Sequence, residues 1–182
     1  MSDINSITRS TFIATGVAAG LSSVVNAQQT SSRNGYLDAI LKWSRKEIIG
    51  DLDYIQIHSA AHIDFNTALY IAEQLAADHR LTKVSAVGEL DLANRPTDVM
   101  AGLYYERNLR ATISSLPSSR DFFGTVLGTM GTIRLYTQRI TLLDKNGETS
   151  DSATVSPSII REETMTLTHV IKALSEGKTI QI

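Results

Sequence analysis

Apolar side chains recur every three or four residues along the stretch from Tyr36 to Arg80, and this spacing places them on one face of an α-helix. No proline interrupts the stretch. Because one globular helix of this length would be unusual, the pattern predicts two helices, 36–58 and 61–80, or one helix kinked near Gly50 or near the histidines. The apolar positions are Leu37, Ile40, Leu41, Ile48, Leu52, Ile55, Phe65, Leu69, Ala72 and Ala76.

The second half of the chain shows the same helical spacing after a connector at 81–94. A third helix is expected at about 94–115, where asparagine and proline give a start signal. A fourth follows at about 118–143, and a last helix is expected from Ser156 to a stop at Gly177. The polar segment 144–155 between these two helices is expected to be a loop that does not bind calcium. The sequence therefore predicts an all-α fold, a four- to five-helix bundle.

The N-terminal residues, Met1 to Ala27, have the pattern of an export signal, with a weakly apolar run before a small-residue cleavage site. Its segment TRSTFIATGVAAG is similar to a twin-arginine leader, but Ser10 stands where the second arginine belongs. The route therefore stays open between twin-arginine and general (Sec) secretion. We expect a periplasmic protein with a signal peptide at 1–27, a polar tether at 28–35 and a single helical domain at 36–182.

The composition of the chain excludes several kinds of chemical site and argues against one class of partner. The chain has 182 residues, a formal net charge of −2 and no cysteine. The absence of cysteine excludes disulfides, thiolate metal sites, iron–sulfur clusters and covalent attachment of haem c to this chain. The near-neutral charge, without basic runs, argues against a nucleic-acid partner.

His58 and His62 form the candidate metal site, because histidines four residues apart on a helix can bind one ion from the same face. Glu47 and Asp51 could add oxygen ligands. The alternative is that these histidines are hydrogen-bonded to neighbouring carboxylates and bind no metal. No Glu-x-x-His pair, nucleophile elbow or glycine-rich phosphate loop is present, so the sequence predicts no catalytic residue and no cofactor-binding residue.

A second group of residues is typical of protein interfaces, where aromatic and arginine side chains are enriched. Glycines within the predicted fourth helix would also allow another backbone to approach closely, either within the bundle or from another subunit. The same aromatic residues are equally usual in half-buried bundle positions. The interface candidates are Trp43, Tyr104, Tyr105, Arg107, Gly124 and Gly128.

The segment LKWSRKEIIGDLDYIQIHSAAHIDFNTALYIAEQLAADH, together with the leader, resembles the small accessory subunits of membrane-bound periplasmic dehydrogenases. The third subunit of quinohaemoprotein alcohol dehydrogenase is the particular likeness, and the small subunits of flavin-dependent sugar dehydrogenases are a neighbouring one. The resemblance implies a non-catalytic subunit that stabilises a large dehydrogenase subunit, beside a cytochrome c subunit that reduces ubiquinone. PQQ and haem c would then belong to those partners, through which the chain would associate peripherally with the inner membrane.

The alternative function is a free-standing periplasmic helical bundle that binds a metal or small ligand near His58 and His62. Independent catalysis stays open, because the residues neither identify a reaction nor exclude one. The accessory-subunit function and the metal- or ligand-binding function differ in what they require of His58 and His62. Only the metal-binding function needs these histidines to bind an ion.

Overall fold

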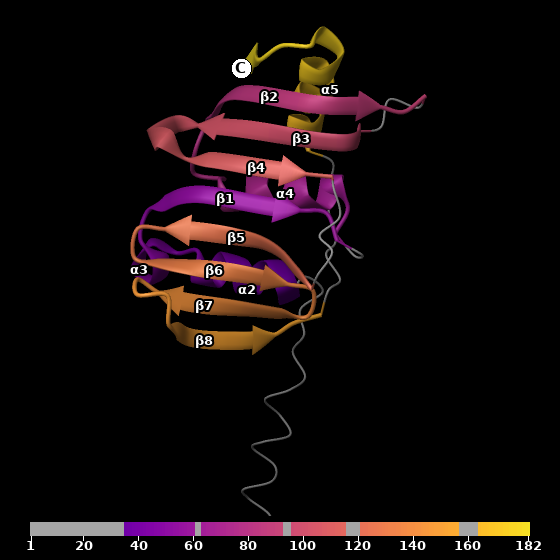
Figure 1. The fold of residues 1–182 in the computed structure, drawn as a ribbon. Helices are drawn as coiled ribbons and strands as arrows, with labels where there is room; N and C mark the ends of the chain where they lie inside the picture. The colour runs from indigo at the N-terminus through magenta and orange to yellow at the C-terminus, as the bar shows by residue number, and fades with distance from the viewer. Residues whose placement is uncertain (1–34, 61–62, 93–95, 116–120, 157–163) are drawn as a thin grey trace, which may run out of the picture. The chain divides into compact units, whose positions relative to one another are not determined.

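The computed structural model describes residues 35–60, 63–92, 96–115, 121–156 and 164–182. In these residues nine strands form one mixed sheet, in the order β8-β7-β6-β5-β1-β4-β3-β2-β9 (Figure 1). The predicted all-α bundle is therefore wrong, and the fold is α/β. The strands are β1 Leu52–His58, β2 Leu81–Leu90, β3 Pro96–Tyr105, β4 Arg110–Ser114, β5 Phe122–Gly128, β6 Gly131–Tyr136, β7 Arg139–Asp144, β8 Thr149–Thr154 and β9 Ile180–Gln181.

Four α-helices cover one face of this sheet (Figure 1). They are α2 Gly35–Trp43, α3 Lys46–Ile49, α4 Phe65–Leu75 and α5 Met165–Glu176, and a short 3-10 turn, Glu106–Asn108, links β3 to β4. Helix α2 contacts β7, α3 contacts β6, α4 contacts β1 and β4, and α5 contacts β2. The opposite face carries no helix from the described part of the chain. Among the described helices, none is long and apolar enough to span a membrane.

The error in the fold prediction is clearest in β1, which was assigned to the first long helix. Ile55 and Ile57 are fully buried, whereas Tyr54, Gln56 and His58 are only half-buried. This alternation is the two-residue period of a strand that packs helices on one face only. Over seven residues the apolar positions also fit a helical spacing, and this ambiguity is typical of short apolar runs.

The same correction applies to most of the second half of the chain. The predicted third helix is the pair β3 and β4, and the predicted fourth helix is the three strands β5, β6 and β7. The predicted loop at 144–155 contains β8. The prediction of helix is confirmed over α2 and α3 within 36–58, and over Phe65–Leu75 and Met165–Glu176. The last of these ends as expected at Gly177, whose φ of +62° is left-handed.

One buried cluster joins the helices to the sheet. The Tyr36 ring of α2 lies 5.7 Å from the Phe123 ring of β5, and its hydroxyl donates a hydrogen bond to the backbone oxygen of Tyr136 at 2.7 Å. Trp43 is only 6% exposed and belongs to the same cluster. Residues 100 positions apart in the sequence are thereby connected, so helix α2 is fixed against the β5–β6 region.

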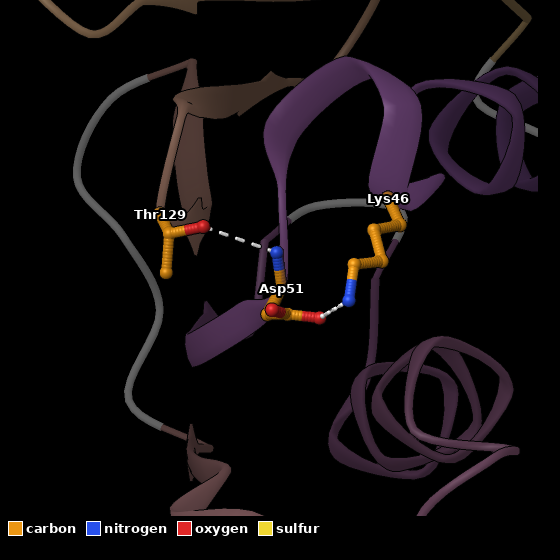
Figure 2. A network of polar contacts seen from close by, with 3 residues as sticks. All are labelled: Lys46, Asp51 and Thr129. Carbon is orange, nitrogen blue, oxygen red and sulfur yellow. Dashed lines mark hydrogen bonds and ion pairs between the residues drawn. The ribbon is translucent and has the colours of Figure 1, made fainter.

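The connection from α3 to β1 is held against the turn between β5 and β6 (Figure 2). The Asp51 backbone N–H donates to Thr129 Oγ1 at 3.1 Å, and Lys46 Nζ lies 2.7 Å from Asp51 Oδ1. Because both ionic side chains are largely exposed, that ion pair adds little to stability. The backbone contacts, which include Met130 N–H to Ile49 oxygen at 2.8 Å, therefore fix where β1 starts.

The signal peptide predicted at 1–27 lies outside the described residues, and so does the tether except for Gly35, which starts α2. The boundaries of these segments stay predictions. The description of 36–182 as helical is wrong, because the described part of this range is built mainly on the sheet.

Candidate functional site at the strand ends

The strands β1 and β4 run parallel and end side by side, with His58 opposite Ser114. They are the only parallel pair among the described strands, since β1 pairs antiparallel with β5 on its other side. In open α/β sheets, ligands bind beyond the carboxyl ends of parallel strands, at the point where the strand order reverses. The carboxyl ends of β1 and β4 are therefore the candidate functional site.

His58 lies half-buried on the sheet face that no described helix covers. Its Nε2 atom is 3.1 Å from Gln56 Nε2, two residues earlier on the same face. An amide NH2 group only donates hydrogen bonds, so the facing imidazole nitrogen accepts one and the ring proton of neutral His58 is on Nδ1. The side chain thereby presents an N–H donor at the end of the strand.

Ser59 and Ser115 continue the two strands beyond this point. The Ser59 backbone N–H donates to the Ser114 oxygen at 2.8 Å, and Ser115 exchanges bonds with Val99 through its backbone N–H at 2.7 Å and its Oγ at 2.6 Å. The Ser59 side chain is 9% exposed, and its Oγ has no hydrogen-bond partner among the described residues. A buried hydroxyl without a partner costs free energy, so it marks a place where a ligand or water hydrogen bond would be favourable.

The segment after Ser59 leads directly into helix α4. Ala60 and Ile63 exchange two backbone hydrogen bonds, of 2.8 and 3.0 Å, and Asp64 then caps the helix by accepting from the Thr67 N–H at 2.7 Å. This local geometry explains why the apolar helical pattern begins again at Phe65. The cap also places a carboxylate at the amino end of α4, beside the strand-end site.

The proposed metal pair no longer has the geometry that suggested it, because His58 is on a strand and not on a helix. His62 lies outside the described residues. Asp51 precedes β1 and Glu47 is in α3, so both are at the opposite end of the strand from His58. No group of three or more metal-binding side chains occurs in the described part of the chain. Metal binding by His58 with His62 stays a prediction.

The interface candidates are dispersed over the structure. Trp43 and Tyr105 are buried, at 6% and 7% exposure, whereas Tyr104 lies on the uncovered sheet face under the Lys83 ammonium, 4.5 Å from the ring centre. Arg107 is exposed in the 3-10 turn, with a left-handed φ of +58°. The predicted glycines Gly124 and Gly128 lie on β5, where they allow close backbone approach within this chain. Their role in contacts between subunits stays a prediction.

A cavity of about 860 Å³ lies at the other end of β1, lined by the α2–β1 connection, the end of α4 and Arg107. Its charged side chains are of both signs: Arg45, Lys46 and Arg107 are basic, and Glu47, Asp51 and Asp78 are acidic. Size alone would make it a ligand site. This mixture of charges, however, selects neither an anion nor a cation, and the strand ends present the more specific chemistry.

Sequence reasoning missed Gln56, Ser59 and Ser114 as parts of the candidate site. The signal was present in the alternation of Ile55 and Ile57 with Gln56 and His58, which is the pattern of a strand. A strand interpretation would have placed Gln56 and His58 on one face. The neighbouring strand end at Ser114 is far away in the sequence, and no local pattern indicates that pairing.

No protein-family model matches the sequence, and no curated protein shows significant similarity to it. The fold, in contrast, is similar to many solved structures. An Agrobacterium radiobacter oxidoreductase in complex with NAD+, L-tartaric acid and magnesium matches over 90% of this chain and 68% of its own, at 13% identity and a TM-score of 0.56. An Azotobacter vinelandii inositol dehydrogenase homolog complexed with NADH and myo-inositol matches over 67% of this chain and 40% of its own, at 9% identity and a TM-score of 0.53.

A super-repressor mutant of Gal80p from Saccharomyces cerevisiae also shares the fold, at 9% identity and a TM-score of 0.58, over 82% of this chain and 62% of its own. The chain spans between 40% and 68% of the length of these three neighbours. Sequence identities this low establish the fold alone. Several of the solved structures that share this fold are described as oxidoreductases.

The resemblance to the quinohaemoprotein accessory subunit is therefore wrong, and so is the function inferred from it, because the solved structures that share this fold include NAD-binding oxidoreductases. The alternative function assumed a helical bundle, and this assumption is wrong because the fold is α/β. PQQ and haem c in partner subunits, peripheral membrane association and the periplasmic location stay predictions.

The amino ends of α4 and α5 do not fit the pyrophosphate of a bound dinucleotide. Such cofactors place their pyrophosphate on the free N–H groups at a helix N-terminus. At α4 those groups face the Asp64 carboxylate, and at α5 the Glu73 carboxylate accepts from the Thr166 N–H at 3.0 Å. A pyrophosphate at either end would meet a negative charge already bonded there.

Proposed function

We propose that this chain is the substrate-side domain of an NAD-linked oxidoreductase that acts on a small polyhydroxylated molecule, such as a polyol or a hydroxy acid. The observation that carries the proposal is the shared fold, which extends over 90% of this chain in the neighbour bound to NAD+ and L-tartaric acid. A second neighbour is bound to NADH and myo-inositol, so hydroxyl-rich ligands occur in both structures.

In this proposal the strand ends bind and orient the substrate. His58 donates its Nδ1 hydrogen to a substrate oxygen, while Gln56 holds the imidazole in the required tautomer through Nε2. The Ser59 hydroxyl, which has no partner among the described residues, gains a hydrogen bond from a ligand that covers the end of β1. A nucleotide, which would accept or return hydride when bound, is not assigned to any described residue in this proposal.

The test measures binding of L-tartrate and succinate to the full chain by calorimetry, because these dianions differ only in the hydroxyl groups of tartrate. Net hydrogen bonds of about 1 kcal/mol each predict tartrate binding at least tenfold tighter. His58→Phe should weaken tartrate binding by about tenfold, because it removes the donor and keeps a planar ring. Lys145→Gln is the matched control in the exposed turn after β7, and tartrate affinity should not change.

Binding of myo-inositol instead of tartrate, weakened by His58→Phe, would support the same site and identify polyols as the preferred class of ligand. Equal affinities for tartrate and succinate would overturn the proposal, because the hydroxyl groups would then contribute nothing. The proposal is also overturned if His58→Phe binds every ligand as tightly as the unchanged chain.

A further inference from the structure

A second cavity, of about 320 Å³, lies at the other end of the sheet from His58 and on its helix-covered side. The end of α4, the start of α5 and the carboxyl end of β3 form its walls. Strand β3 runs antiparallel to β4, so its last residue, Tyr105, lies near the start of β4 and away from Ser114. The cavity is therefore separate from the strand-end site.

The polar lining of this cavity is incomplete in its hydrogen bonding. Tyr105 is only 7% exposed, and its hydroxyl has no partner among the described residues. His79, after the end of α4, likewise has a buried Nδ1 atom without a described partner. Two residues that line one small cavity thus carry an unpartnered polar atom, which is unusual in a native fold, and each atom would be stabilised by a ligand that hydrogen-bonds to it.

The charge in the cavity is negative. Glu73 of α4 lines it and accepts hydrogen bonds through Oε1 from the backbone N–H and hydroxyl of Thr166, which hold the carboxylate in place. No lysine or arginine lines the cavity among the described residues. Burial raises the pKa of the Tyr105 phenol, and the charge of Glu73 raises it further, so the phenol is neutral and Glu73 lies close enough to act on it.

Apart from the imidazole of His169, the rest of the lining is apolar. Leu81 lies on one wall, and Met165 and Ile182 are 80% and 41% exposed at the cavity. Large apolar side chains with this exposure gain free energy when a ligand covers them. The lining thus combines a fixed carboxylate, a second imidazole at His169 and two residues with an unpartnered polar atom with an aliphatic rim.

We propose that this cavity binds a small primary alkylammonium ion. An ammonium group carries three N–H donors and no acceptor, which matches the Glu73 carboxylate, the Tyr105 hydroxyl oxygen and, in the tautomer that carries its proton on Nε2, the Nδ1 lone pair of His79. The alkyl chain lies against Leu81, Met165 and Ile182. A metal ion fits less well, because no group of three or more metal-binding side chains was found among the described residues.

The experiment titrates the full chain with n-butylammonium, n-butanol and n-butyrate at about pH 8, where an alkylamine is protonated. Binding is followed by NMR through the methyl signals of Met165 and Ile182. These probes have nearly the same size and differ in the head group, so the comparison isolates charge and donors. The proposal predicts shifts at Met165 and Ile182 with butylammonium, affinity at least tenfold weaker for butanol, and no binding of butyrate.

Tyr105→Phe removes the unpartnered hydroxyl and should weaken butylammonium binding by about tenfold, as expected for a hydrogen bond to a charged donor. Tyr104→Phe is the matched control, because it removes a phenol hydroxyl from the preceding residue, which faces the opposite side of the sheet. If Tyr105→Phe fails to fold, Glu73→Gln provides a second test, since it keeps an acceptor for Thr166 and removes the charge.

Butylammonium binding that is matched by butanol, or that is equal in the Tyr105→Phe and Tyr104→Phe variants, would overturn the assignment. The same holds if no probe shifts Met165 or Ile182. None of these outcomes depends on tartrate or on His58, so this proposal and the proposed oxidoreductase function can fail independently.

Discussion

Substituting Gly128 by alanine tests how tightly the turn between β5 and β6 is packed against α3. A Cβ atom at this position would lie 2.2 Å from the backbone oxygen of Ile49 and 2.9 Å from its carbonyl carbon. Carbon and oxygen atoms in close contact are normally separated by about 3.3 Å, so the two backbones would have to separate by about 1 Å. The same Ile49 oxygen accepts the Met130 N–H at 2.8 Å, and this separation would weaken that bond.

The expected cost of Gly128→Ala combines overpacking of about 2 kcal/mol with about 1 kcal/mol for the weakened hydrogen bond. The free energy of unfolding should therefore fall by about 3 kcal/mol, which corresponds to a decrease in Tm of about 6–12 °C for a domain of this size. Urea unfolding followed by the fluorescence of Trp43, the single tryptophan and 6% exposed, measures the change.

Gly102→Ala is the control for this prediction. Gly102 is also a strand residue, but an added Cβ would meet only side-chain atoms, with Ser85 Oγ at 2.9 Å and the Tyr104 ring at 3.4 Å. Those side chains can rotate on the uncovered face, so its effect should stay below about 1 kcal/mol. If the two variants unfold at the same urea concentration with equal slopes, the close approach of β5 to Ile49 is refuted.

Three further predictions concern buried or capping groups. Tyr36→Phe leaves the backbone oxygen of Tyr136 without its donor and should lower the free energy of unfolding by about 1–3 kcal/mol, measured by urea unfolding; no change would mean that water replaces the hydroxyl. Burial is the main cause that raises the pKa of the Tyr36 and Tyr105 phenols, so near pH 10 only the unfolded chain loses these protons. The stability that the two phenols contribute is therefore complete below about pH 10 and is lost above it. The free energy of unfolding should fall by up to about 1.4 kcal/mol per pH unit for each phenol. Unfolding of Tyr105→Phe between pH 9 and 11 should show the slope reduced by one such contribution, and an unchanged slope would contradict the assignment. Asp64→Ala removes the cap of α4 and should cost about 1 kcal/mol, whereas Asp64→Asn should cost less; equal losses would show that the charge, and not the accepted hydrogen bond, is what matters.

Two of the helices that sequence reasoning located correctly, α4 and α5, have local signals at one end. Asp64 caps α4 and Gly177 ends α5 in a left-handed conformation, and both signals act within a few residues. The strands lack such signals. In β5 and β6, Phe123, Val126 and Ile133 face the core, and they also fit a helical spacing when read across the turn at Thr129.

The order of the sheet depends on contacts that no local pattern encodes. Strand β1 pairs with β4 and β5, which follow it by more than fifty residues, and this pairing brings His58 beside Ser114. His58 was identified as a candidate from the sequence, but the prediction that it lies on a helix was wrong. Its actual neighbour Gln56 is two residues away, as the period of a strand requires.

The most direct test of the strand-end site is the 15N NMR spectrum of the imidazoles in the full chain, recorded with and without L-tartrate and assigned with the His58→Phe variant. We predict that neutral His58 carries its proton on Nδ1, and that tartrate shifts this nitrogen while the signals of His79 and His169 stay in place. A His58 signal that does not move when tartrate binds, or a proton on Nε2, would contradict the proposed site.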